Sequence, residues 1–230
     1  MSSGLDTLLE HRAVWRCGRT GQQRSSTATS ATISTGYPSL DAALPNGGWP
    51  RQTLIEVLSS RAGIGELRLL MPALAALLAE RDGYLVWVGS PYQPYAPALL
   101  QWDIDVERVL LVTATAPADV LWACGEALSS GSAVAVLGWL DALDITASRR
   151  LKLAAAQGQS LAVLFRSLQT RQQTSAASLR LALASGSEGT CVDLFKVSGG
   201  RPRRIPAYEQ AHAFWPPLAT SDTTPNTLPG

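Results

Sequence analysis

The stretch from Ile33 to Leu67 constrains the fold of this chain more than any other part of its sequence. A loop rich in Gly and Pro leads into an apolar strand, predicted over Thr53 to Leu58. A loop of small residues, Ser59 to Gly65, follows. A long apolar helix is then predicted from about Glu66 to Arg81, with a kink at Pro72. A strand, a small-residue loop and a helix in this order form the usual setting of a phosphate-binding loop. The sequence therefore predicts the start of an ATP-binding α/β core.

The rest of the central region alternates between predicted strands and helices. A buried strand is predicted at Tyr84 to Val88, and the later segments are Ala96–Trp102 (helix), Val109–Val112 (strand), Ala118–Ser130 (helix), Ala133–Leu137 (strand), Thr146–Gln157 (helix) and Leu161–Phe165 (strand). This alternation predicts an α/β fold with a mostly parallel sheet and helices on both faces. Two runs of alternating polarity after Ser178, joined by GSEG at 186–189, predict a C-terminal antiparallel hairpin.

The two ends of the chain differ in composition from this core. Apolar residues at helical spacing predict an N-terminal helix within residues 1–17, which either packs on the domain or docks a partner. Residues 18–32 are rich in Ser, Thr and Gln and are interpreted as a flexible linker, so the predicted domain spans residues 33–200. Residues 201–230 begin with a basic patch and continue as a Pro- and Thr-rich tail, for which disorder is predicted.

Composition narrows the class of protein further. The 230 residues are 46% hydrophobic and 16% charged, which fits one globular domain with additional end segments. A formal charge of +1 gives no overall basic field, so any contact with nucleic acid would be local. Three widely separated cysteines and two histidines predict no metal site and suggest reduced thiols. No apolar run is long enough to span a bilayer, so we expect a cytoplasmic protein without membrane contact.

Several residues of the opening stretch resemble the RecA family, and the resemblance implies a RecA-like core. The residues that carry it are ISTG at 33–36, SLD at 39–41, Gly47-Gly48 and IEV at 55–57. The phosphate-binding pattern G-x-x-x-x-G-K-[ST] is only partly present. Ser60 stands at the first Gly and Gly65 at the second, with Gly63 between them, while Glu66 replaces the Lys and Leu67 the hydroxyl residue. Glu66 would also compete with an anion for the positive end of the following helix.

The other groups that a RecA-like ATPase needs are missing as well. The strand ending at Val88 runs into GSPYQPY at 89–95, which contains no carboxylate to position the attacking water. The strand at 133–137 runs into Gly138-Trp139-Leu140 where a magnesium-binding aspartate is expected, and Asp141 follows too late. The sequence therefore predicts a scaffold with no catalytic residue and no cofactor, and a cryptic ATPase is the less favoured hypothesis.

Six residues are candidates for contacts with partners: Trp15, Trp139, Lys196, Arg201, Arg203 and Arg204. Trp139 comes at the end of a strand, where ligands bind in open α/β sheets, and core packing is its alternative. Lys196 and Arg201 resemble basic residues that RecA filaments present to the neighbouring nucleotide. The three arginines, with Arg166 and Arg171 beside a predicted loop at 167–175, either make weak DNA contacts or are ordinary solvated charges. Core positions are expected for Trp87, Trp102 and Trp122.

A second resemblance, to the ImuA family of SOS mutagenesis cassettes, rests on AVWR at 13–16, LPNGGWP at 44–50, GIGEL at 63–67, YAPAL at 95–99 and GWL at 138–140. It implies an accessory role in SOS-induced, error-prone translesion DNA synthesis. The implied partners are an ImuB-like Y-family polymerase homologue, the second replicative-type polymerase subunit of these cassettes, and RecA.

The stretch from Leu69 to Arg166 is also similar to SulA, most clearly in VLGWL at 136–140. The alternative function is therefore a SulA-like inhibitor of cell division that acts on FtsZ. The segment before the phosphate-binding loop, which SulA lacks, favours ImuA.

Overall fold

The computed structural model describes residues 14–16, 31–186 and 189–205. Its strands are β1 (Val14–Arg16), β2 (Thr32–Ile33), β3 (Trp49–Pro50), β4 (Leu54–Ser59), β5 (Tyr84–Val88), β6 (Val109–Val112), β7 (Ala133–Trp139), β8 (Leu161–Ser167), β9 (Leu179–Gly186), β10 (Gly189–Val197) and β11 (Arg203–Ile205). Its α-helices are α2 (Pro38–Asp41), α3 (Met71–Glu80), α4 (Ala96–Leu100), α5 (Pro117–Ser129) and α6 (Ile145–Gln157). Three short 3₁₀ helices are η1 (Pro45–Gly47), η2 (Val106–Arg108) and η3 (Leu168–Gln172).

Nine strands form one sheet in the order β1-β6-β5-β7-β8-β4-β9-β10-β11. The strands from β6 to β9 pair in parallel, and β10 pairs antiparallel with both β9 and β11. Strand β4, which precedes the small-residue loop, lies between β8 and β9 in the interior of the sheet. The predicted α/β class, the mostly parallel sheet and the C-terminal antiparallel hairpin are confirmed.

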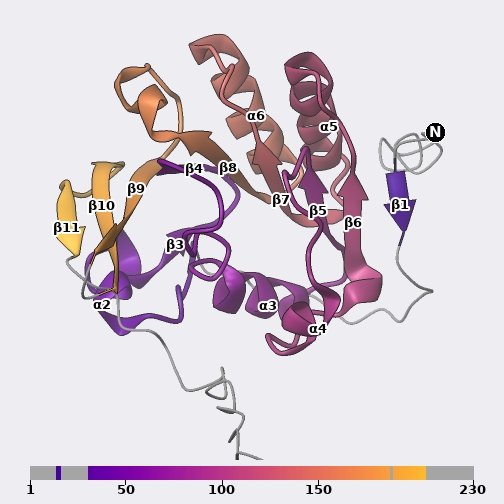
Figure 1. The fold of residues 1–230 in the computed structure, drawn as a ribbon, viewed down its shortest axis with the longest axis horizontal. Coiled ribbons are helices and arrows are strands. Elements are labelled where there is room, and N and C mark those ends of the chain that lie inside the picture. Colours follow the sequence, from indigo (N-terminus) through magenta and orange to yellow (C-terminus); the bar gives the residue numbers. More distant parts are fainter. Residues whose placement is uncertain (1–13, 17–30, 187–188, 206–230) are drawn as a thin grey trace, which may run out of the picture.

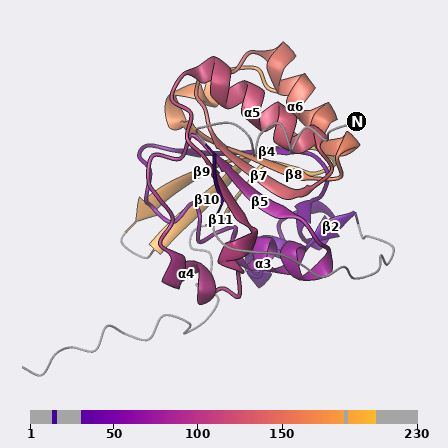
Figure 2. The ribbon, with the colours of Figure 1, turned by 90° about the vertical axis from the view of Figure 1, so that its right-hand side faces the viewer.

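Helices cover both faces of the sheet, as predicted (Figures 1 and 2). Helices α5 and α6 lie on one face, and α2, α3 and α4 lie on the other. Each face has its own apolar core. Strand β7, with the sequence AVAVLGW, is buried at six of its seven positions because both of its faces are covered.

Close packing of α5 on β7 requires a glycine at position 138. A Cβ atom on Gly138 would lie 2.7 Å from the Sγ atom of Cys124 in α5 and 2.9 Å from Cδ2 of Leu164 in β8. The helix could not approach the strand this closely if position 138 carried a side chain.

The prediction of a helix from Glu66 with a kink at Pro72 was wrong. Helix α3 begins only at Met71, and Pro72 lies in its first turn, where its missing N–H costs nothing. The carbonyl of Arg68, four residues before Pro72, instead accepts a hydrogen bond of 2.9 Å from the hydroxyl of Tyr37. Residues 66–70 form turns that lead into the helix.

Differences also occur at both ends of the described chain. Val14–Arg16, predicted as part of a helix, form β1 and pair antiparallel with β6, which would otherwise leave the edge of the sheet open. Residues 1–13, 17–30 and 206–230 lie outside the described residues, as do the predicted helix, linker and tail segments that fall on them. Arg203–Ile205, beyond the predicted domain boundary at residue 200, form β11.

In the part of the chain that the structure describes, no helix is both long and apolar enough to cross a membrane.

Candidate functional site

A crevice of about 310 Å³ lies where β4, β5, β7 and β8 end. Its lining comes from the loop after β4 and from the carboxyl ends of the other three strands: Ser59, Ser60, Arg61, Ala62, Glu66, Gly89, Pro91, Trp139, Leu140, Asp141, Phe165, Arg166 and Ser167. The crevice thus contains the degenerate phosphate-binding loop. It also contains the segments after β5 and β7, where an ATPase would carry its water-positioning and magnesium-binding carboxylates. Ligands of open parallel sheets bind at this edge.

The side chain of Glu66 occupies the backbone donors of the loop. Its Oε1 atom accepts a hydrogen bond of 2.6 Å from the amide of Gly63, and Oε2 accepts one of 2.9 Å from the amide of Ile64. Glu66 is only 5% exposed, so its carboxylate belongs to the folded loop and not to the surface. Glu66 was expected to compete with an anion for the positive end of the following helix; in the structure its carboxylate lies on two amides of the loop, before the helix begins.

The other loop positions lack the groups that would hold a magnesium nucleotide. Ser60 is exposed, and the apolar side chain of Leu67 packs against the core. Gly63 and Gly65 have φ angles of +82° and +104°, a left-handed conformation that glycine adopts without strain. Asp141 is exposed, and its Oδ1 atom accepts a hydrogen bond from the amide of Ser167. Among the described residues, no cluster of acidic, His or Cys side chains could hold a metal ion.

Aromatic side chains form one wall of the crevice. Trp139 is the last residue of β7 and is half-buried. Its ring stacks on Phe165 of β8 with centroids 4.6 Å apart, and its centroid is 5.7 Å from that of Trp87. Trp139 therefore packs on the core, which was the predicted alternative, and it also lines the crevice.

A buried ion network adjoins the crevice through Arg166, which belongs to both. Glu56, at the centre of β4, is fully buried. Its Oε2 atom accepts hydrogen bonds from Arg180 (2.8 Å from Nε) and Arg166 (3.1 Å from Nη1), and its Oε1 atom accepts one from the hydroxyl of Ser175. One carboxylate thus faces two guanidinium groups, and backbone carbonyls compensate the excess positive charge.

This network fixes the segment that follows β8. The guanidinium of Arg180 donates hydrogen bonds to the carbonyls of Thr170, Arg171 and Gln173, at 3.0, 3.2 and 2.9 Å. Arg166 donates to the side chain of Gln173 at 2.7 Å and to the carbonyl of Asp141 at 2.7 Å. The segment predicted as a loop at 167–175 contains η3, and these hydrogen bonds attach it to the core.

The buried position of Arg166 contradicts both alternatives for it, a DNA contact and a solvated charge, whereas Arg171 stays a candidate. Arg166 is 3% exposed and is engaged with Glu56. Arg171 pairs with Asp193 at 2.8 Å and lies over the ring of Phe195. Sequence reasoning also missed Glu56 and Arg180. The signal was present, since charges within apolar strands are rarely buried unless they are paired.

Lys196 adds a further cation to this region. Its Nζ atom donates a hydrogen bond of 2.6 Å to the carbonyl of Ser175. Burial lowers the pKa of Lys196, and the charges of Arg180 and Lys152 lower it further. The side chain is engaged with the chain's own backbone.

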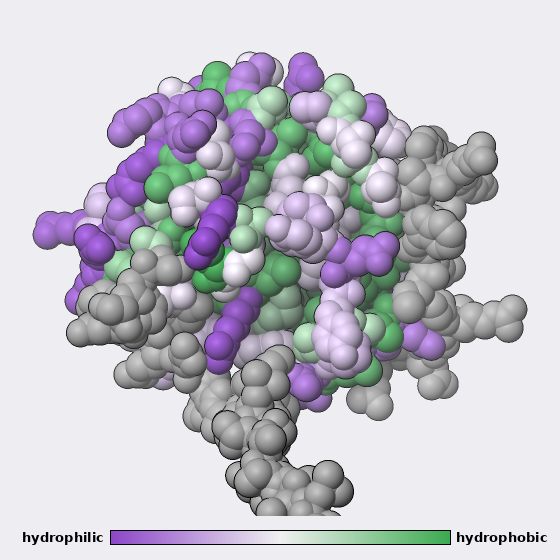
Figure 3. All heavy atoms as spheres, viewed as in Figure 1, coloured by the Kyte–Doolittle hydropathy of each residue, from purple (hydrophilic) through white to green (hydrophobic). Residues whose placement is uncertain are grey.

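The three remaining basic candidates lie together at the far edge of the sheet. Arg201, Arg203 and Arg204 are all exposed, on β11 and the turn before it. Arg204 contacts Cys191 of β10, with 3.2 Å between Nε and Sγ. Hydrophilic side chains gather on this side of the molecule (left in Figure 3). Trp15 lies in β1 at the opposite edge, so the six candidates do not form one surface.

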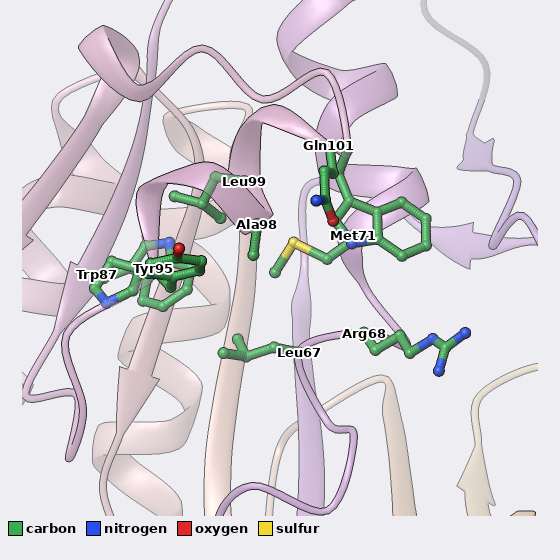
Figure 4. A pocket seen from close by; sticks show the side chains of 10 residues that line it. Leu67, Arg68, Met71, Trp87, Tyr95, Ala98, Leu99 and Gln101 are labelled. Carbon is green, nitrogen blue, oxygen red and sulfur yellow. The ribbon is translucent and has the colours of Figure 1, made fainter. Parts of the chain in front are cut away.

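A second concave surface, which sequence reasoning did not find, lies beside β5. This groove has a volume of about 330 Å³ and is largely apolar (Figure 4). It is lined by Leu67, Arg68, Met71, Trp87, Pro94, Tyr95, Ala98, Leu99, Gln101 and Trp102. Trp87 is buried and Trp102 is half-buried, close to the expectation for both, whereas Trp122 is 48% exposed and was wrongly assigned to the core.

Comparison with known proteins gives relatives for about half of the chain. No family model matches it. ImuA of Caulobacter vibrioides strain NA1000 is 32% identical over 126 residues, which are 53% of this chain and 52% of that protein. The chain therefore spans about half the length of this relative. The cell division inhibitor SulA of Edwardsiella piscicida is 29% identical over 115 residues, which are 50% of this chain and 68% of that protein.

The sequence of one protein of known structure is also similar to this chain. The crystal structure of SulA from Pseudomonas aeruginosa is 31% identical, covers 49% of this chain and 97% of that chain, and has a TM-score of 0.41. The curated relatives show that about half of this chain is homologous to ImuA and related to SulA.

Proposed function

We propose that this chain is a non-catalytic accessory protein of SOS-induced, error-prone translesion DNA synthesis. It uses a RecA-like core as a scaffold to which other proteins bind. The relationship to ImuA supports the pathway, and the order of strand, small-residue loop, helix and parallel sheet supports the RecA-like core.

One observation carries the non-catalytic part of this proposal: the carboxylate of Glu66 lies on the amides of Gly63 and Ile64. In a phosphate-binding loop, backbone amides and a lysine attract the phosphates of the nucleotide. Here a buried negative charge would repel them. The lining of the crevice also offers no lysine.

The crevice is better suited to a protein partner. The half-buried ring of Trp139 provides apolar contact area, and Arg61 and Asp141 provide exposed charges of both signs. Aromatic contacts surrounded by polar groups are typical of protein interfaces. We assign this crevice to the ImuB-like polymerase homologue. The second polymerase subunit and RecA are further partners, and the exposed arginines of β11 are the site of any weak DNA contact.

Capture experiments test this function. The immobilised full chain is incubated separately with the ImuB-like protein, RecA and FtsZ, in the presence and absence of ATP and Mg²⁺. Capture of the ImuB-like protein to the same extent in both conditions is the expected result. Capture that requires ATP would contradict a scaffold with a closed nucleotide site.

The alternative function is inhibition of cell division through FtsZ. It is favoured by the match to SulA, which covers 68% of that relative. Overproduction of the chain would then produce filamentous cells, and FtsZ would be captured while the ImuB-like protein would not.

A further inference from the structure

The apolar groove beside β5 is not part of the crevice assigned to the partner. Its lining side chains come from the turn before α3, from β5 and from α4 (Figure 4). Ten residues line it, and Arg68 is the one charged residue among them. Tyr95, one of the lining residues, is 72% exposed, and Tyr92 and Leu100, nearby in the sequence, are 68% and 57% exposed. Apolar surface gathered in this way usually marks a contact with another segment or protein.

The chemistry of the groove matches a proline-rich segment. Trp87, Tyr95 and Trp102 give it an aromatic lining, and aromatic grooves bind proline-rich segments in the extended polyproline conformation. Such a segment has no internal hydrogen bonds, so its carbonyls need donors. The buried indole N–H of Trp87 has no acceptor among the described residues. The groove thus offers an aromatic surface, beneath which this donor lies buried.

We propose that this groove binds the chain's own segment Phe214-Trp215-Pro216-Pro217-Leu218. This segment combines two adjacent prolines with two aromatic residues and a leucine. Residues 17–30, which also lie outside the described part, contain no large apolar side chain that could fill the groove. The bound segment would cover the exposed tyrosines and shield the groove from other proteins.

The length of the chain after β11 allows this contact within one molecule. Strand β11 is six strands away from β5 in the sheet order. At the usual spacing of strands this distance is roughly 29 Å. Ten residues, from Pro206 to Trp215, span up to roughly 34 Å when extended. Strand β11 also runs toward the side of the sheet on which α2, α3 and α4 lie (Figure 1).

Amide hydrogen exchange of the full chain tests the proposal. A double variant, Trp215→Ala with Pro217→Ala, removes the apolar contacts without touching the described core. We expect amides in residues 95–102 to exchange about tenfold faster in this variant than in the wild type. The matched control, Thr220→Ala with Thr224→Ala, alters the same tail outside the proposed segment and should exchange as the wild type does.

Three outcomes would overturn the proposal. The first is equal exchange in the double variant and the wild type. The second is faster exchange of the groove in a Leu8→Ser, Leu9→Ser variant instead, which would assign the groove to the N-terminal residues. The third is protection that falls when the protein is diluted, which would assign it to the tail of a second copy. The crevice residues Trp139 and Arg61 are unchanged in all of these variants, so partner capture remains a separate readout.

Discussion

The carboxylate of Glu66 lies 2.6 Å from the backbone nitrogen of Gly63, within the loop where a nucleotide-binding protein would hold phosphate. A second hydrogen bond from Ile64 makes the contact bidentate. An anion supplied by the chain itself thus takes the place of an anion supplied by a ligand. The loop has Gly63 and Gly65 at left-handed φ angles, and two of its amide donors are used to stabilise the fold.

Replacing Glu66 should expose this role. In a Glu66→Ala variant, two loop amides lose their acceptor, so we expect the free energy of unfolding to fall by about 1–3 kcal/mol. Added sulfate should recover part of this loss, because an anion can take the vacated position. Urea denaturation with and without sulfate measures both effects. Glu107→Ala, at an exposed position, is the control and should change little. A Glu66→Ala variant as stable as the wild type would show that the contact contributes nothing.

Arg180 should be essential for the rigidity of the segment after β8. Loss of its guanidinium in Arg180→Met leaves the buried Glu56 with one fewer partner, so we expect a loss of about 3–5 kcal/mol in unfolding free energy. Arg171→Met, which removes the half-exposed ion pair with Asp193, should cost only about 1 kcal/mol. Hydrogen exchange of residues 168–175 should rise strongly in the first variant only. Similar effects of both substitutions would contradict the central position of Arg180.

The thiol of Cys124 should be inert in the folded protein. Burial raises its pKa to about 12, and the thiolate is the reactive form. At pH 8 its reaction with iodoacetamide should be roughly a thousandfold slower than that of free cysteine, whose pKa is near 8.5. The measurement uses a Cys17→Ser, Cys191→Ser variant, so that a single thiol is followed. Rapid labelling without denaturant would mean that α5 does not stay packed on β7.

A charge reversal at the rim of the crevice should weaken partner binding. Arg61 lines the crevice and is exposed, so Arg61→Glu changes the surface charge while leaving the core intact. We expect the dissociation constant for the ImuB-like protein to rise about tenfold, which corresponds to a loss of about 1.4 kcal/mol in binding free energy. Arg149→Glu, an exposed position on α6, is the matched control. Equal affinity of both variants would place the partner elsewhere.

The sequence was a good guide wherever the pattern of apolar residues was regular. β5 and β6 were predicted to the residue, and the other parallel strands to within two residues, because buried parallel strands are almost entirely apolar. The boundaries that were missed depended on distant contacts. Pro72 was read as a kink, although it is the hydroxyl of Tyr37 that takes up the carbonyl that Pro72 leaves free. No local sequence pattern predicts that contact.

The site was only partly predictable for a similar reason. The position of Glu66 in the loop pattern indicated competition with an anion, and its carboxylate does lie on a loop amide, but the exact amides could not be read from the sequence. Arg166 looked like a surface cation because its partner, Glu56, is 110 residues away in the sequence. The groove beside β5 escaped notice because core positions were expected for Trp87 and Trp102, and the segment that contains Tyr95 was searched only for a carboxylate.

The central claim is that this chain binds its partner as a scaffold with a closed nucleotide site. Calorimetric titration of the full chain with the ImuB-like protein, in the presence and absence of ATP and Mg²⁺, tests it most directly. We predict the same dissociation constant in both conditions and no heat of binding when ATP and Mg²⁺ are titrated alone. Binding of ATP to the chain, or partner affinity that depends on ATP, would contradict the account.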